Sequence, residues 1–89
     1  MFKVTKDPGA TLDYAIDWSQ WLGDDDSISS ASASADDGIS VDSDDMAGNH
    51  HVIWLSGGQA RRIYTVTSRI VTAGGRIDDR SIQVYVVDR

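Results

Sequence analysis

With 89 residues and no cysteine, the chain is long enough for one small domain, and neither a disulfide nor a thiolate metal site can stabilise it. Its formal net charge of −6 disfavours nucleic-acid binding, because a domain that binds phosphates is expected to be basic. No stretch is long and apolar enough to cross a bilayer, and the first residues lack the apolar segment of a secretory signal. We therefore expect a cytoplasmic product with no membrane contact.

Residues 1–10 predict an extended N-terminal arm that bends at Pro8-Gly9, and residues 11–89 predict a single domain. Residues 12–18 then alternate between Leu, Tyr, Ile or Trp and Asp or Ala. This period of two predicts a strand with one buried face. An acidic loop follows at residues 23–26.

Residues 27–35, SISSASASA, allow two interpretations. Their composition is typical of a flexible linker. Their strict alternation of Ala and Ser instead favours a strand, whose small side chains let two sheets approach closely, and we prefer this interpretation. Residues 36–38, Asp-Asp-Gly, then predict a hairpin turn, because Asp-Gly suits a positive φ, and residues 39–43 predict a short returning strand.

The rest of the chain predicts a loop at residues 44–50 and strands at residues 51–56, 62–72 and 80–87, separated by two Gly-Gly turns. Apolar residues on both faces of the first of these strands indicate a central strand or one covered on both sides. Six or seven strands with short turns and no convincing helix predict an all-β fold, a small antiparallel β-sandwich of immunoglobulin-like type. A small barrel is the alternative.

Charge is distributed unevenly along these elements. Residues 1–50 carry two Lys against 11 Asp, a net charge of −9, whereas residues 51–89 carry six Arg against three Asp, a net charge of +3. Two interpretations stay open. The two halves neutralise each other within one fold, or an acidic face of one molecule meets a basic face of its neighbour.

No group of residues has the pattern of a catalytic or cofactor site. The Asp clusters lack the spacing and the final Glu of an EF-hand loop, so we interpret them as solvated turns, with calcium binding as the alternative. His50 and His51 are adjacent and point to opposite faces of a strand, so we expect one loop His and one packed His and no metal site. Gly57 to Arg62 lacks the Lys-Ser/Thr pair of a phosphate loop and indicates a hairpin turn. We therefore predict a protein that is not an enzyme and uses no cofactor or metal.

Three Trp residues, Trp18, Trp21 and Trp54, are many for so small a domain. Exposed Trp side chains stack on sugar rings in carbohydrate-binding modules. Each Trp buries a large area, however, so we expect these three in the core or in an assembly interface. A carbohydrate-binding β-sandwich module is the alternative.

Two blocks of residues together resemble, in their order, a family of small tailed-bacteriophage virion proteins described as phage fibre–tail adaptors. The first block contains Lys6-Asp7-Pro8, Leu12-Asp13-Tyr14, Asp17-Trp18, Trp21-Leu22 and Asp26-Ser27-Ile28. The second block contains Trp54 to Gly58, Tyr64 to Thr67, Gly74-Gly75-Arg76 and Asp79 to Ile82. The blocks cover about two thirds of the chain. Residues 29–37 depart from the resemblance, because they are more polar than the family pattern.

The resemblance implies an immunoglobulin-like structural protein of the virion, made in the host cytoplasm. Its partners would be tail fibres, neighbouring tail or neck proteins, and copies of itself in a symmetric assembly, with neither nucleic acid nor membrane. A capsid decoration protein is the alternative within the same class, so the capsid is a further possible location.

We expect the partner contacts in the arm and in the two Gly-Gly turns. An extended arm cannot bury itself, and turns at the ends of a sandwich are free to bind. Arg side chains beside these turns can form bidentate pairs with carboxylates of a partner. The residues expected to bind partners are Phe2, Lys3, Lys6, Pro8, Gly57, Gly58, Arg61, Arg62, Gly75 and Arg76.

Overall fold

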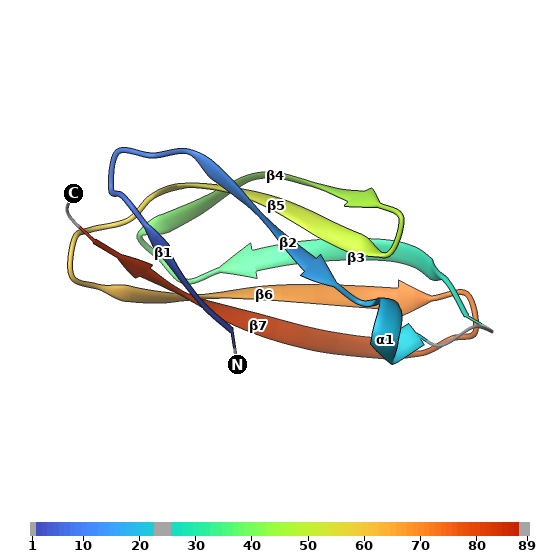
Figure 1. The fold of residues 1–89 in the computed structure, drawn as a ribbon. Helices are drawn as coiled ribbons and strands as arrows, with labels where there is room; N and C mark the ends of the chain where they lie inside the picture. Colours follow the sequence, from blue (N-terminus) through green and yellow to red (C-terminus); the bar gives the residue numbers. More distant parts are fainter. Residues whose placement is uncertain (1, 23–25, 88–89) are drawn as a thin grey trace.

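Two β-sheets packed face to face make up the computed structural model, which describes residues 2–22 and 26–87 (Figure 1). One helical turn connects the second and third strands, and within the described residues no helix is long and apolar enough to cross a membrane. The elements are β1 Phe2–Lys6, β2 Leu12–Asp17, α1 Ser19–Leu22, β3 Ile28–Ala35, β4 Ile39–Ala47, β5 His50–Gly57, β6 Ile63–Thr72 and β7 Ile77–Val86.

The strand order confirms the immunoglobulin-like sandwich. One sheet has the order β1-β7-β6-β3 and the other the order β2-β5-β4. In immunoglobulin letters, β2, β5 and β4 correspond to B, E and D, and β3, β6 and β7 correspond to C, F and G. The first strand differs from the constant-type arrangement, because β1 runs parallel to β7 instead of joining the sheet of β2. Since the two sheets stay separate, the fold is not a closed barrel.

The N-terminal residues belong to this sandwich. We expected an arm outside the domain, but the structure pairs β1 with β7 from Phe2↔Ile82 to Lys6↔Val86. Val4 packs against the core, and Lys6 is fully buried. These residues are extended, as their sequence predicts, and they gain a hydrogen-bonded neighbour because the outer side of β7 is open to them.

The Ala-Ser segment forms strand β3, which confirms the strand interpretation over the linker. It pairs with β6 from Ile28↔Thr72 to Ala35↔Val66. Its Ala side chains pack against the core, and the Ser side chains between them are exposed. The small side chains therefore lie where the two sheets meet, as the alternation predicts.

Strand β4 is longer than predicted, and the loop expected at residues 44–50 is wrong for residues 44–47. A shift of register between Val41 and Ser43 interrupts the alternation, after which the strand continues to pair with β5 as far as Ala47↔His50. A tight turn at Gly48, with φ 62°, then reverses the chain. A bulge inserts one extra residue into a strand. A prediction based on strict alternation therefore ends the strand at the bulge, which is too early.

Strand β7 also begins earlier than predicted, at Ile77 instead of Arg80. Its first residues pair with the end of β6, from Val71↔Ile77 through Arg69↔Asp79. Arg69 and Asp79 form two hydrogen bonds, of 2.7 and 3.1 Å, across the exposed face of the sheet. Opposite charges on neighbouring strands therefore hold a segment that the prediction left outside the strand.

The core lies between the two sheets and includes residues from both. The central strand β5 contributes Ile53 and Leu55, which are fully buried, while its Trp54 faces outward. This arrangement confirms the prediction of a central strand with apolar residues on both faces. The buried hydrophobic residues are Ile16, Trp18, Leu22, Ile39, Ile53, Leu55, Tyr64, Val66, Ile70, Ile82, Val84 and Val86.

Candidate functional site

Most of the residues expected to bind partners lie at two opposite ends of the sandwich, whereas Phe2 and Lys3 pair with Ile82 and Gln83 midway along β7. Strand β6 runs between these ends: Ile63 pairs with Tyr85 at one end, and Val71 pairs with Ile77 at the other. Ten strand residues span about 33 Å. The connection from β5 to β6 lies at the first end, and the turn from β6 to β7 lies at the second (Figure 1). The two Gly-Gly turns therefore cannot belong to one compact binding site.

Lys6 links the connection between β1 and β2 to the corner between β5 and β6. Its Nζ donates hydrogen bonds to the carbonyl oxygen of Gly57, at 2.7 Å, and to that of Asp7, at 2.8 Å. Burial lowers the pKa of Lys6, while the carboxylates of Asp7 and Asp42 raise it. Its ammonium group is thus engaged inside this chain. Pro8 is half-buried in the adjacent turn, where Gly9 N donates to Asp7 Oδ1 at 2.9 Å.

The glycines of the β5–β6 corner shape the backbone. Gly57 and Gly58 have φ of 80° and 93°, a region that favours glycine. A Cβ atom on Gly58 would lie 2.7 Å from Cγ2 of Val86. The backbone N–H of Gln59 donates to the hydroxyl of Tyr64 at 2.9 Å, so Tyr64 closes this corner as the tyrosine corner does in immunoglobulin-like domains.

An exposed surface adjoins this corner, and we name Arg61, Arg62, Ile63 and Tyr85 the corner patch. Ile63 and Tyr85 pair across neighbouring strands and are 55% and 41% exposed. The guanidinium groups of Arg61 and Arg62 are exposed and have no hydrogen-bond or ion-pair partner among the described residues. Lys3, on the same sheet, is also exposed. The patch therefore combines an apolar pair with two free cations.

Ile63 and Tyr85 were missed in the sequence, although a signal for them existed. The period-two pattern of β6 and β7 assigns Tyr64 and Val84 to the core face, so the residues beside them must face outward. A large apolar residue on an outward position is a candidate for a contact surface, and two such positions lie opposite each other here.

At the other end, Gly75 and Arg76 have different surroundings. Gly75 has φ of 89°, and a Cβ atom there would meet nothing within 4 Å, so this turn is open. The Arg76 guanidinium donates to Asp26 Oδ2 and to the carbonyl oxygen of Leu22, each at 3.1 Å, and lies 4.5 Å from the ring centre of Trp21. Arg76 is therefore engaged within the chain.

Asp26 is the acceptor that holds this end together. Its Oδ1 accepts hydrogen bonds from Gly74 N and Ser27 N, each at 2.9 Å. The hydrogen bond from the Thr72 side chain, followed by those from Gly74, Ser27 and Arg76, lowers the pKa of Asp26 to about 2, against a raising effect of desolvation. One carboxylate thus connects the segment before β3 with the β6–β7 turn.

The three Trp residues do not form a common platform. Trp18 is fully buried, which confirms its place in the core, and its ring meets that of Trp21 edge-on at 5.5 Å. The guanidinium of Arg80 covers Trp18 at 4.7 Å. Trp54 instead lies on the outer face of the three-stranded sheet, 41% exposed. The sugar-stacking alternative would therefore depend on Trp54 alone.

One line of hydrogen bonds that no sequence pattern indicated runs from the exposed Asp44 to three buried residues, His51, Ser68 and Trp18. His51 Nε2 lies 2.6 Å from Asp44 Oδ2, and His51 Nδ1 lies 2.6 Å from Ser68 Oγ. Trp18 Nε1 donates to Ser68 Oγ at 3.1 Å. The residues come from β4, β5, β6 and the single residue between β2 and α1, so the line connects both sheets.

The direction of one hydrogen bond in this line is fixed by chemistry. The Trp18 indole can only donate, so the Ser68 hydroxyl accepts from it. The His51 ring then connects that hydroxyl, through Nδ1, to the Asp44 carboxylate, through Nε2. Although Asp, His and Ser also form hydrolase triads, Ser68 and His51 are fully buried, so a substrate has no access to this hydroxyl. The line packs and connects the sheets. It also confirms that His51 is a packed His, while His50 is exposed beside Asp17.

The charges separate by sheet. Strands β2, β5 and β4 contain five Asp and no Lys or Arg, whereas β1, β3, β6 and β7 contain four Lys or Arg and two Asp. Within the described ranges 2–22 and 26–87, no three His or Asp side chains come together as metal ligands. The five Asp of the three-stranded sheet are Asp13, Asp17, Asp42, Asp44 and Asp45.

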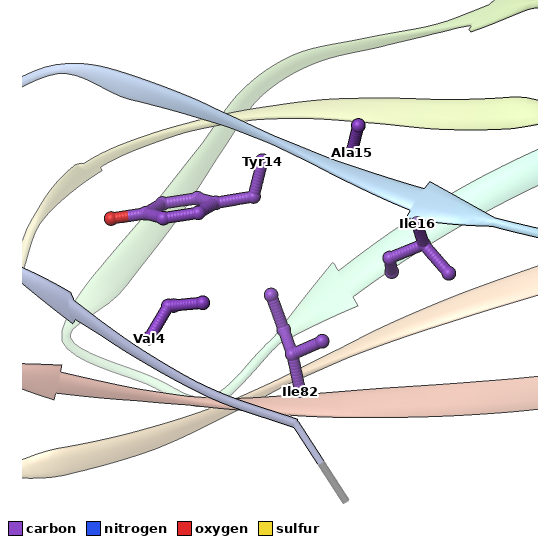
Figure 2. Close-up of a pocket in the computed structure, with 5 residues that line it drawn as sticks. All are labelled: Val4, Tyr14, Ala15, Ile16 and Ile82. Atoms are coloured by element: carbon purple, nitrogen blue, oxygen red, sulfur yellow. The ribbon is translucent and has the colours of Figure 1, made fainter.

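A small apolar pocket of about 90 Å³ opens between the first two strands and β7. Figure 2 shows Val4 and Ile82 on one side of it and Tyr14 and Ile16 on the other, with the Tyr14 hydroxyl pointing out of the pocket. That hydroxyl donates to the carbonyl oxygen of Thr5 at 2.8 Å, which joins β2 to β1. The side chains that line the pocket could accommodate an apolar group, but they include no charged group that could pair with a charged ligand.

Comparison with known proteins gives one family. The profile of the family described as podophage GP4 fiber-tail adaptor protein gp77 matches residues 6–85, a range that runs from the last residue of β1 into β7. Among curated proteins, none matches the chain. The match confirms the resemblance to the phage fibre–tail adaptor family.

Proposed function

The chain belongs to the phage fibre–tail adaptor family that matches its residues 6–85, and from this premise we propose that it is a non-enzymatic structural protein of the virion that attaches tail fibres to the tail. The observation that carries this proposal is the extent of the match, which includes nearly every strand of the sandwich. The fold supports it too, because His51 and Ser68, the His–Ser pair that resembles part of a hydrolase triad, are enclosed and hydrogen-bonded in the core.

An adaptor must hold two neighbours apart and bind both. The sandwich provides a rigid spacer, and its two ends are separated by the length of β6. We assign the corner patch to one partner. Ile63 and Tyr85 would supply the apolar centre of that contact, and Arg61 and Arg62 would pair with carboxylates of the partner at its rim.

The remaining expected contacts complete the proposal. Pro8 and the Gly57-Gly58 corner lie near the corner patch, and Gly75 and Arg76 belong to the opposite end. Phe2 and Lys3 lie between these ends, on the edge strand β1. Copies of the chain around a symmetric tail would be further partners, because the acidic three-stranded sheet of one copy can face cations of the next. Neighbouring tail or neck proteins fit the same role.

Labelling the protein in assembled particles tests this assignment. Gold particles bound to an epitope tag on the chain should lie at the junction between tail and fibres in electron micrographs. Label distributed over the capsid would instead identify a capsid decoration protein and contradict the proposal. Particles in which only the fibres carry the same tag give the reference position of the fibre base.

A further inference from the structure

Strand β3 is an edge strand without the protections that the other edges have. It lies at one end of the order β1-β7-β6-β3, is eight residues long, and contains neither a charged residue nor Pro. Edge β4 carries three Asp and a register shift, edge β2 carries two Asp, and edge β1 has only five residues. Charges, bulges and short strands are the usual means by which an edge strand blocks the addition of another strand. Among the described edges, β3 therefore stays open to strand addition in the part that follows its bulge at Ser29.

The register identifies the backbone groups that are unpaired. Asp36 N donates to the carbonyl oxygen of Thr65 at 3.1 Å, directly after the β3–β6 ladder ends at Ala35↔Val66. In an antiparallel ladder, every second residue directs both its N–H and its C=O to the neighbouring strand. Residues 32, 34 and 36 therefore face β6, and Ala31, Ala33 and Ala35 direct their N–H and C=O groups away from it.

The position next to these groups is one that related folds fill. Variable-type immunoglobulin domains add extra strands to the sheet of C, F and G after strand C. Here β3 turns within residues 36–38 into β4, which pairs with β5 in the other sheet. Figure 1 shows this direct turn. Among the described residues, no strand therefore pairs with the outer side of β3, although β4 lies close to it after the turn.

We infer that residues 31–35 of β3 receive an extended segment of a partner protein, which adds a strand to the four-stranded sheet by β-augmentation. The inference rests on the proposed adaptor function and names how one partner is held. The segment should alternate small residues, beside the Ala positions, with polar residues, beside the exposed Ser positions.

Charge favours a different protein over a second copy as the source of this strand. Asp36 and Asp37 follow β3 directly, and the neighbouring edge β4 adds Asp42, Asp44 and Asp45. Two copies joined through β3 would bring both acidic edges to one interface, which like charges oppose. A segment flanked by Lys or Arg matches this border.

A proline substitution at Ala33 separates the contribution of backbone hydrogen bonds to partner binding from their contribution to the stability of the fold. Ala33→Pro removes an N–H that faces away from β6, a position where an edge strand tolerates Pro, whereas Ala33→Gly keeps the N–H. We expect folded A33P protein to attach tail fibres to tails lacking the chain about tenfold or more weakly than A33G, as the loss of main-chain hydrogen bonds implies. Equal attachment by folded A33P and A33G overturns the inference.

Hydrogen exchange gives a second measurement that needs no variant. The amides of Ala31, Ala33 and Ala35 should exchange fast in the free protein and slowly in intact virions. Fast exchange in both states overturns the inference even where A33P fails to fold. If fibres still require the chain while these amides stay unprotected, the strand addition is wrong and the adaptor function stands. If fibres attach without the chain, the adaptor function itself is wrong.

Discussion

The hydroxyl oxygen of Ser68 lies 2.6 Å from Nδ1 of His51, deep between the two sheets, and receives the indole N–H of Trp18 from its other side. Both Ser68 and His51 are fully buried. In an immunoglobulin-like sandwich without cysteine, this contact joins β5 of one sheet to β6 of the other. It therefore connects the two sheets without a disulfide, whereas antibody domains join strands B and F by one.

Replacing Ser68 with Ala should destabilise the fold by about 1–3 kcal/mol, because the Trp18 N–H and His51 Nδ1 both lose their partner in a buried site. Urea unfolding followed by Trp fluorescence measures this. Ser32→Ala on the exposed face of β3 is the control and should change the free energy of unfolding by less than about 0.5 kcal/mol. Equal stability of the two variants would show that the buried line does not hold the sheets together.

The two Gly-Gly turns should respond differently to Ala. Gly58→Ala places a methyl group 2.7 Å from Cγ2 of Val86 and imposes a positive φ on Ala, whereas Gly75→Ala imposes only the positive φ. We expect about 1–2 kcal/mol of lost stability for G75A and clearly more for G58A. Thermal unfolding of both variants checks the order, and a G75A variant less stable than G58A contradicts it.

Asp26 predicts a pH dependence of stability with a definite sign. Its pKa in the folded chain is about 2, below the ordinary value of 3.8, so folding favours the carboxylate. Its contribution is complete above about pH 4 and is lost as the pH falls toward 2. The stability difference between the native chain and Asp26→Asn should therefore shrink between pH 5 and pH 2.

Urea unfolding at several pH values measures that difference. Asp13→Asn is the matched control, because the exposed Asp13 side chain has no hydrogen bond or ion pair among the described residues. A stability difference for Asp26→Asn that stays constant down to pH 2 would contradict the role assigned to its hydrogen bonds.

Removing the apolar centre of the corner patch should weaken fibre attachment without unfolding the protein. We expect Tyr85→Ala together with Ile63→Ala to reduce binding to the fibre or the tail by about tenfold or more, since central aromatic and aliphatic anchors carry most of the affinity of an interface. Melting temperature is the stability check. The variant Leu12→Ala, which removes an exposed apolar side chain on the three-stranded sheet, is the control, and an equal effect of both changes would contradict the assignment of the patch.

Most of the fold could be predicted from the sequence, because alternating apolar and polar residues identify strands with one buried face. Residues 12–18 and the Ala-Ser segment both follow this rule, and both are strands. The end of strand β4 was predicted wrongly because a bulge near Val41 breaks the alternation. The prediction did not place residues 2–6 in the sandwich, because their parallel pairing with β7 depends on a neighbour about 80 residues away in the chain.

The candidate site was less predictable for the same reason. Lys6 and Arg76 are expected surface cations by composition, yet one is buried against Gly57 and the other binds Asp26. Contacts between residues about 50 positions apart leave no local pattern. The exposure of Arg61 and Arg62 was predictable, because a corner between strands lies on the surface of almost any sandwich.

The most direct test of the adaptor function is to count fibres on particles assembled without this chain, before and after purified protein is added. Electron micrographs should show tails without fibres, and the addition of the native chain together with fibres should restore them. Tails that carry their full set of fibres in the absence of the chain would contradict the account.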